Sequence, residues 1–307
     1  MTEHTYVLGV DIGGTNIRLG LVDEEGNLSG YQKISQQSIL YGDDTIQSLA
    51  EYLKGYLQEF AKDKQVIALA AGIPAAMSRD RSTVWNAPNI KGFSGRNVKE
   101  VLQPHFSFPV LLEKDVTMLF YYDLMQHKIP HKDVLIACYI GTGIGNVISV
   151  DGKVLIGNDG AAGELGHIPV WDKTDICNCG NEGCMESHVG GKYLVELREK
   201  RFPDVEINQL FTVYGDTPEM ERYLEHLSLP ITTEINILNP AVIILGGGVL
   251  SMPDFPREKL EHYIYKHSRK PLPADNLKLV YSDNQGENGI YGAAIYAREI
   301  LEQRKGE

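Results

Sequence analysis

Cysteine, tryptophan and long apolar segments are scarce in this sequence. Only four cysteines and two tryptophans occur among its 307 residues. No apolar run approaches the roughly 20 residues that a membrane-spanning helix needs, so we predict no transmembrane segment and no membrane partner. Lysine and arginine form no cluster, and the formal net charge is −12. Because nucleic-acid binding depends on clustered cations, the sequence argues against a nucleic-acid partner.

A secretory signal is also absent from the start of the sequence. Residues 1–5 carry no apolar core of the kind that signal peptides have. We therefore expect a cytoplasmic protein with reduced thiols. The apolar content of 43 % and the charged content of 23 % are ordinary for a globular protein, and the length allows two domains.

Apolar strands alternate with amphipathic helices along the chain, which is typical of α/β proteins. The expected strands cover residues 6–12, 65–73, 109–112, 134–140 and 241–245, and the expected helices cover residues 45–60, 116–125 and 220–238. Asp43 or Asp44 caps the first helix, and Pro230 could interrupt the last one. A strand, a glycine turn and a second strand occur twice, about 130 residues apart, which indicates two related halves.

Glycine-rich turns follow three of the expected strands. They are Gly13-Gly14, Gly141-Thr142-Gly143-Ile144-Gly145 and Gly246-Gly247-Gly248. Backbone N–H groups at such turns can bind phosphate oxygens, and Thr15 and Thr142 add hydroxyl donors. The first turn joins two strands, whereas a Walker loop or a dinucleotide fingerprint requires a helix at that point. A single glycine turn could simply reverse the chain, but three favour a nucleotide site of another kind.

Three of the four cysteines lie close together in the sequence. Cys177, Cys179 and Cys184 follow His167 and form with it a Cys₃His set, the ligand number and type of a closed tetrahedral zinc site. The grouping could be incidental, or two thiols could pair as a disulfide, but reduced thiols favour a metal. Cys138 lies in an apolar run and is expected to be a buried strand residue.

Asp115 is the candidate catalytic base. It follows an expected strand and precedes an expected helix, a usual place for catalytic groups in α/β folds. Its carboxylate could accept the proton of a sugar hydroxyl during phosphoryl transfer. The alternative is that Asp115 only caps the helix that begins at Val116.

Four further polar residues are candidate ligands of substrate hydroxyls. Glu164 and Glu186 flank the cysteine cluster, so a bound metal would fix where their carboxylates point; alternatively, both are solvated surface charges. His167 could bind zinc through one ring nitrogen while the other nitrogen contacts a ligand or a neighbouring group. Asn89 is either a turn residue or a hydroxyl-binding amide.

Five stretches of the sequence together resemble the ROK (repressor, open reading frame, kinase) family of sugar kinases. They are Asp11-Ile-Gly-Gly-Thr-Asn-Ile-Arg, Ile140-Gly-Thr-Gly-Ile-Gly, Gly163-Glu-Leu-Gly-His, Cys177-Asn-Cys-Gly-Asn-Glu-Gly-Cys-Met-Glu and Ile244-Leu-Gly-Gly-Gly. They cover nearly the whole chain in the family's order. The histidine combined with the Cys-x-Cys-Gly-x-x-Gly-Cys-x-Glu pattern is highly specific.

The resemblance implies an actin-like, ribonuclease-H-like α/β fold with two domains around a nucleotide and sugar cleft. We expect a smaller N-terminal domain over residues 1–115, completed by a C-terminal helix over residues 294–307. A larger domain over residues 116–293 would carry the zinc loop. The resemblance further implies ATP and a hexose as substrates, catalytic Mg²⁺, structural Zn²⁺ and a homodimer.

The resemblance also assigns roles to individual residues. Asp11, Gly13, Gly14, Thr15 and the turn from Gly141 to Gly145 would face the ATP phosphates and Mg²⁺, and Gly246, Gly247 and Gly248 would approach adenosine. Asp115 would take the proton of the sugar's 6-hydroxyl. Ring hydroxyls would be held by Asn89, Glu164, His167 and Glu186.

Lys114 departs from the usual pattern of the family. Family glucokinases usually carry Asn-Asp where this chain has Lys114-Asp115, so a cation replaces an amide that contacts the sugar. D-Allose kinases within the family resemble this chain in placing a basic residue there. The stretches Ala162-Gly-Glu-Leu-Gly-His-Ile-Pro, Met252-Pro-Asp-Phe-Pro-Arg-Glu and Arg269-Lys-Pro-Leu-Pro also resemble them. The sequence therefore predicts ATP-dependent phosphorylation of a hexose at the 6-hydroxyl, with D-allose as the expected sugar and Lys114 as one of its ligands.

Other functions stay open at this point. Glucose, an N-acetylhexosamine, mannose and fructose are alternative substrates of the same reaction. A ROK-type repressor would carry an additional helix-turn-helix domain, for which a first strand beginning near Tyr6 leaves no room. A sugar-binding protein without catalysis is disfavoured because Asp115 and both phosphate-binding turns are present.

Overall fold

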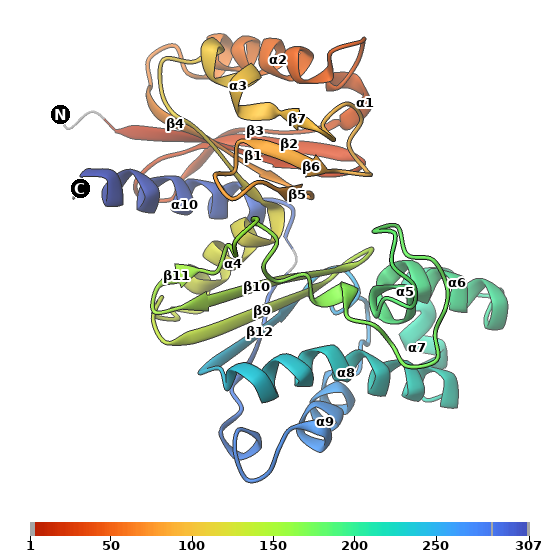
Figure 1. Cartoon of the computed structure of the whole chain (residues 1–307). Helices are drawn as coiled ribbons and strands as arrows, with labels where there is room; N and C mark the ends of the chain where they lie inside the picture. The colour runs from red at the N-terminus through yellow and green to blue at the C-terminus, as the bar shows by residue number, and fades with distance from the viewer. Residues whose placement is uncertain (1–3, 284, 306–307) are drawn as a thin grey trace. The chain divides into compact units, whose positions relative to one another are not determined.

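The computed structural model describes residues 4–283 and 285–305, and it has the α/β architecture expected from the sequence (Figure 1). The chain divides into two compact units. Unit 1 comprises Met1–Ile129, Ile156–Ala162 and Gln285–Glu307, and unit 2 comprises Pro130–Leu155 and Gly163–Asn284. Each unit contains a five-stranded sheet and its own hydrophobic core.

The sheet of unit 1 has the strand order β3-β2-β1-β4-β8. Its first three strands form an antiparallel meander, whereas β1, β4 and β8 run parallel. The strands are β1 (Thr5–Ile12), β2 (Asn16–Val22), β3 (Leu28–Ser35), β4 (Gln65–Ile73) and β8 (Val110–Lys114). A smaller sheet holds β5 (Ala76–Met77), β6 (Thr83–Asn86) and β7 (Arg96–Asn97). The helices are α1 (Gln36–Ile39), α2 (Thr45–Phe60), α3 (Val98–Leu102), η1 (Gln103–His105), α4 (Asp115–Gln126) and α10 (Asn288–Lys305).

Helix α2 illustrates why the sequence folds as predicted in this unit. Its residues Ile46, Leu49 and Leu53 recur at helical spacing and are buried in the core of unit 1. Asp44 caps the helix, since its carboxylate accepts hydrogen bonds from the N–H groups of Ile46 and Gln47 (3.2 Å each). The predicted helix over residues 45–60 and one of its two candidate caps are therefore confirmed.

The sheet of unit 2 repeats the arrangement of the first, with the order β11-β10-β9-β12-β13. An antiparallel hairpin is again followed by parallel strands, which confirms the two related halves indicated by the sequence. The strands are β9 (Val134–Ile140), β10 (Ile144–Val150), β11 (Lys153–Val154), β12 (Val242–Gly246) and β13 (Leu279–Tyr281). The helices are η2 (Leu165–His167), α5 (Glu186–Val189), α6 (Gly191–Arg201), η3 (Ile207–Gln209), α7 (Leu210–Tyr214), α8 (Pro218–Leu238), α9 (Arg257–His267) and η4 (Ala274–Asn276).

Helix α8 runs without a break through Pro230, so the interruption considered above does not occur. Pro230 is buried together with Leu227 and Ile231. Burial of this apolar face offsets the backbone hydrogen bond that proline cannot donate. Neither α8 nor any other helix in the described part of the chain has the length and apolar character needed to cross a membrane.

The two units differ from the domains expected from the sequence. Helix α4 and the whole of α10 belong to unit 1, whereas boundaries at residues 115 and 294 would place α4 and the start of α10 in the second domain. Close packing explains the difference. A Cβ at Gly292 of α10 would overlap the Met118 carbonyl of α4, and a Cβ at Gly9 of β1 would lie 2.6 Å from Ile290 O.

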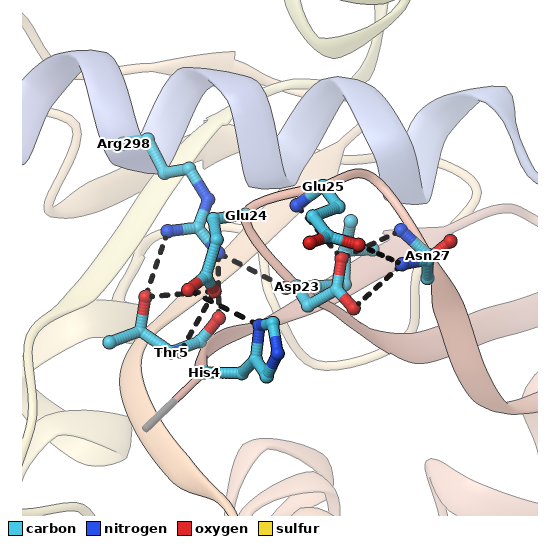
Figure 2. Close-up of polar contacts among 8 residues, drawn as sticks. His4, Thr5, Asp23, Glu24, Glu25, Asn27 and Arg298 are labelled. Carbon is cyan, nitrogen blue, oxygen red and sulfur yellow. Dashed lines mark hydrogen bonds and ion pairs between the residues drawn. The ribbon is translucent and has the colours of Figure 1, made fainter. Parts of the chain in front are cut away.

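Arg298 on α10 fixes the start of β1, as Figure 2 shows. Its guanidinium donates hydrogen bonds to Thr5 O (2.9 Å), Thr5 Oγ1 (3.1 Å) and Val22 O (3.4 Å). The Thr5 N–H in turn donates to Glu24 Oε2 (2.8 Å). The last helix of the chain is thereby joined to the first two strands of unit 1.

Gly292 and Gly55 provide a matched test of this packing. Gly292→Ala should lower the free energy of unfolding by about 1–3 kcal/mol, because the backbone would have to shift to admit the methyl group. Gly55→Ala, on the exposed face of α2, meets no atom within 4 Å. It should raise the free energy of unfolding by about 0.5–1 kcal/mol through helix propensity. Urea unfolding followed by circular dichroism measures both, and unchanged stability of the Gly292 variant would contradict the close approach of α10 to α4.

Candidate active site

Two carboxylates lie at one edge of the sheet of unit 1. Asp11 is near the end of β1, and Asp115 follows β8 directly as the first residue of α4. Because β1, β4 and β8 are parallel, their carboxyl ends share this edge. A Cβ at Gly72 of β4 would lie 3.1 Å from Asp115 Cα, and one at Gly289 of α10 would lie 3.0 Å from Asp11 Cγ. Glycine at these two positions lets the backbone pass close to both carboxylates.

The surroundings of both carboxylates disfavour ionisation. Burial, reinforced by the negative charge of Asp11, raises the pKa of Asp115 to about 6. Burial also raises the pKa of Asp11, and Arg18 partly offsets this effect, since its Nη1 lies 3.1 Å from Asp11 Oδ2. A carboxylate with a pKa near neutrality suits general base catalysis, because it can accept and release a proton at physiological pH.

Asp115 also takes part in the start of helix α4. Its Oδ1 accepts a hydrogen bond from Val116 N (2.9 Å), while Lys114 is the N-cap residue and makes no side-chain capping bond. The two roles weighed for Asp115, helix start and base, are therefore compatible, because the N–H bond involves one carboxylate oxygen. Lys114 itself is buried, and its Nζ donates to Ala162 O (3.3 Å). Its charge lowers the pKa of Asp115 and so opposes the effect of burial.

Asn89 lies beside the first glycine turn in unit 1. A Cβ at Gly14 would be 3.2 Å from Asn89 Cβ. Gln36 joins the two segments, because its Nε2 donates to Gly13 O (2.9 Å) and to Asn89 O (3.1 Å), while its N–H donates to Thr15 O (2.9 Å). Sequence analysis missed Gln36, since a single glutamine in a four-residue helix lies in no recognisable motif.

The second glycine turn, in unit 2, is packed against Glu186. Glu186 Oε2 accepts a hydrogen bond from Ile144 N (2.8 Å), and a Cβ at Gly143 would overlap this carboxylate. Gly145 follows on β10, opposite Tyr139 of β9. The fold therefore places one predicted sugar ligand directly on a turn predicted to bind phosphate.

A pocket of about 580 Å³ lies next to this turn within unit 2. Its lining residues are Gly141, Thr142, Gly191, Lys192, Leu194, Val195, Ile207, Gly248, Val249 and Met252. The other nucleotide-site candidates of unit 2, which are not among them, are Gly143, Gly145, Gly246 and Gly247. Gly247, at φ +95°, instead packs against the backbone of Ile140. Apolar walls next to a glycine turn can receive a flat ring system.

The four candidate metal ligands lie together in unit 2. The ligand atoms of His167, Cys177, Cys179 and Cys184 are all within 4.8 Å of one another. The Sγ atoms of Cys179 and Cys184 are 3.6 Å apart, and Cys177 Sγ is 3.7 Å from His167 Nδ1. Tetrahedral zinc with Zn–S bonds of about 2.3 Å places two sulfurs about 3.8 Å apart, so the set fits zinc. The cysteines are free thiols, which contradicts the disulfide alternative.

His167 connects the cysteine cluster to Glu164. Its Nδ1 faces Cys177, while its Nε2 lies 3.7 Å from Glu164 Oε2. Both residues belong to one short turn, in which Glu164 precedes η2 and His167 ends it. A metal bound at Nδ1 would therefore also fix the position of the Glu164 carboxylate.

The two related sheets define the fold as that of the actin-like ATPases. The crystal structure of a ROK hexokinase from Thermus thermophilus has a TM-score of 0.78 and 25 % identity, covering 97 % of this chain and 99 % of that chain. The sequence profile of the ROK family matches residues 7–300, so the chain belongs to the ROK family.

Curated relatives match over nearly the full length. A glucokinase of Streptomyces coelicolor is 26 % identical over 321 residues, which is 95 % of this chain and 97 % of the relative. An N-acetyl-D-glucosamine kinase of Vibrio cholerae is 25 % identical over 304 residues, which is 94 % of this chain and 97 % of the relative. The resemblance drawn from the motifs is therefore confirmed for the family.

Metal analysis tests the cysteine cluster. Protein purified without chelator should carry one zinc ion per chain, and Cys184→Ser should lose most of it, because a tetrahedral site lacks a ligand without this thiol. Cys138→Ala is the control, since Cys138 is fully buried on β9, outside the cluster. Inductively coupled plasma mass spectrometry measures the stoichiometry. Absence of zinc from the wild type, or equal zinc in both variants, would contradict the assignment.

Proposed function

We propose that this chain transfers the γ-phosphoryl group of ATP to the 6-hydroxyl of a hexose, and that D-allose is its preferred sugar. The observation that carries the proposal is the pair of carboxylates in unit 1, Asp11 and Asp115. The pair supplies a base whose pKa of about 6 is close to the operating pH of a general base. The names of the relatives, a glucokinase and an N-acetyl-D-glucosamine kinase, support an ATP-dependent sugar kinase.

Asp115 is the residue that handles the proton in this reaction. As the sugar's 6-hydroxyl oxygen bonds to the γ-phosphorus, the bond between that phosphorus and the bridging oxygen of ADP breaks. Asp115 accepts the proton of the hydroxyl and later releases it to solvent. Phosphoryl transfer needs little other covalent chemistry from the protein, so the remaining residues act by positioning and charge.

Asp11 is the residue that would hold Mg²⁺. Carboxylate oxygens are the ligands this ion prefers, and a carboxylate whose pKa is raised by burial is stabilised in its charged form by a nearby cation. When bound, Mg²⁺ supplies charge neutralisation at the phosphates of ATP. The backbone N–H groups of the glycine turns and the apolar pocket of unit 2 support a role in binding the phosphates and the adenine ring.

The sugar ligands proposed in unit 2 are Glu164, His167 and Glu186, and those in unit 1 are Asn89 and Lys114. Carboxylates and amides suit this role because they accept or donate hydrogen bonds to hydroxyl groups. We propose that the zinc ion is structural, since all four positions of a tetrahedron would be filled by His167 and the three cysteines.

The preference for D-allose is supported by Lys114 and by the two stretches that begin at Met252 and Arg269. A buried ammonium next to the base replaces the amide that family glucokinases usually carry. An ammonium donates three hydrogen bonds and accepts none, so it requires an acceptor lone pair from the hydroxyl it contacts. The alternatives for the same reaction are glucose, an N-acetylhexosamine, mannose and fructose.

A substrate panel tests the preferred sugar. ADP release should be measured with Mg²⁺ and ATP across D-allose, D-glucose, D-mannose, D-fructose and N-acetylated hexosamines, and D-allose should have the highest kcat/KM. Lys114→Met keeps the length of the side chain but removes the ammonium. It should reduce the preference for D-allose over D-glucose about tenfold, because a buried hydrogen bond to the sugar is lost. Preference for another hexose would leave the kinase standing and overturn the allose assignment.

Asp115→Asn tests the base. Turnover should fall by about 10²–10⁴-fold, since asparagine cannot accept the proton. Wild-type kcat/KM should fall as the pH drops below about 6, because the protonated carboxyl of Asp115 is no longer a base. The folded-state pKa lies above the usual value, so the ionised carboxylate costs stability above pH 6. The variant should therefore unfold at the same temperature as the wild type or higher at pH 7.5.

Near-normal turnover of a well-folded Asp115→Asn protein would contradict the base assignment. Calorimetry at pH 7.5 separates this outcome from a folding defect. A wild type that releases ADP with none of the sugars would contradict the proposed kinase function itself.

A further inference from the structure

Arg81 in unit 1 is buried and ion-paired, although it belongs to none of the motifs of the sequence. Only 7 % of its surface is exposed, and its Nε lies 2.9 Å from Oε1 of Glu113, which is 3 % exposed. The same Oε1 accepts the backbone N–H of Lys114 (2.9 Å). One carboxylate oxygen therefore contacts both Arg81 and the residue that precedes the proposed base.

The guanidinium also holds a segment of chain that is distant in sequence. Arg81 Nη1 donates to Gly160 O (2.9 Å), and Lys114 Nζ donates to Ala162 O (3.3 Å). Both carbonyls belong to Ile156–Ala162, the short segment that is part of unit 1 while its flanking residues are part of unit 2. Together with the carboxylate contacts, these bonds close a ring that includes the ammonium of Lys114.

The backbone of Arg81 has a conformation that favours glycine, with φ +58°. The turn that imposes it is fixed by its own polar contacts. Asp80 Oδ1 accepts hydrogen bonds from Ser78 Oγ (2.6 Å) and Ser82 N (3.1 Å), and Arg81 N donates to Ser78 O (2.9 Å). Glycine would satisfy this turn with less strain, so what arginine adds is the reach of its side chain.

We infer that Arg81 is a positioning residue that fixes the ammonium of Lys114 and thereby sets how strictly the enzyme discriminates between hexose epimers. The inference rests on the proposed function, in which Lys114 is a ligand of the sugar. Epimers differ only in the direction of one hydroxyl, whereas a free lysine side chain is flexible. The ring restrains Lys114 at both ends: Glu113 holds its backbone N–H, and Arg81 holds the segment whose last carbonyl accepts from its ammonium.

Substitution of Arg81 tests the inference in the intact protein. Arg81→Gln removes the charge, and Arg81→Lys keeps a charge near Glu113 but cannot contact Glu113 and the Gly160 carbonyl with one planar group. Both variants should lower the ratio of kcat/KM for D-allose to that for D-glucose, by about tenfold for Arg81→Gln. The KM for ATP should change less than about twofold, because the lost contacts lie around Lys114. If Arg81→Gln does not fold, Arg81→Lys carries the test.

A double-mutant cycle shows whether Arg81 acts through Lys114. In the Lys114→Met background, Arg81→Gln should leave the allose-to-glucose ratio unchanged, because the group that it positions is already gone. Arg79→Gln is the matched control, since Arg79 is an exposed arginine in the same turn, and it should behave as the wild type. A structural role alone would lower the melting temperature and leave the ratio unchanged.

Two results would overturn the inference while leaving the kinase function intact. One is an unchanged epimer ratio in folded Arg81→Gln and Arg81→Lys proteins. The other is an equal effect of Arg81→Gln with and without the Lys114 ammonium. If the wild type phosphorylates no hexose, the proposed function fails first, and this inference fails with it.

Discussion

Four glycines let strands β1 and β4 and helices α4 and α10 approach one another more closely than side chains would allow. They are Gly9, Gly72, Gly289 and Gly292. This close packing buries Asp11 and Asp115 at the edge of one sheet and lets the charge of one act on the other. Ionised carboxylates are costly to bury, so the arrangement persists because the apolar core of unit 1 stabilises the surrounding fold. The raised pKa of Asp115, on which the proposed chemistry depends, is a direct consequence of this packing.

The two units use one strand arrangement for different purposes. In each, an antiparallel hairpin with a glycine turn is followed by parallel strands. A side chain from a following helix fixes the turn in both cases, Gln36 in unit 1 and Glu186 in unit 2. Beyond that point the units diverge. Strand β8 leads into Lys114 and the proposed base, whereas β12 leads into the glycine turn at Gly248, which lines the apolar pocket.

The cysteine cluster and the Arg81 ring act on side chains proposed to contact the sugar. In unit 2, His167 joins the cluster to Glu164. In unit 1, Arg81 and Glu113 restrain Lys114. Both arrangements limit the freedom of groups that would otherwise be mobile, and pre-organised groups bind and discriminate with less loss of entropy. The peptide bond between Ala162 and Gly163 links the two, because it joins the segment held by Lys114 to the turn that carries Glu164.

Sequence alone determined what depends on local pattern. The helix over residues 45–60, the glycine turns, the repeat and the Cys₃His set could all be predicted, because periodicity, turn chemistry and ligand spacing are properties of neighbouring residues. Tertiary structure alone decided the rest. The unit boundaries, the unbroken helix at Pro230, the role of Gln36 and the burial of Arg81 all depend on contacts between segments far apart in the chain. No local pattern encodes such contacts, since they arise only when the two cores pack and exclude water from particular side chains.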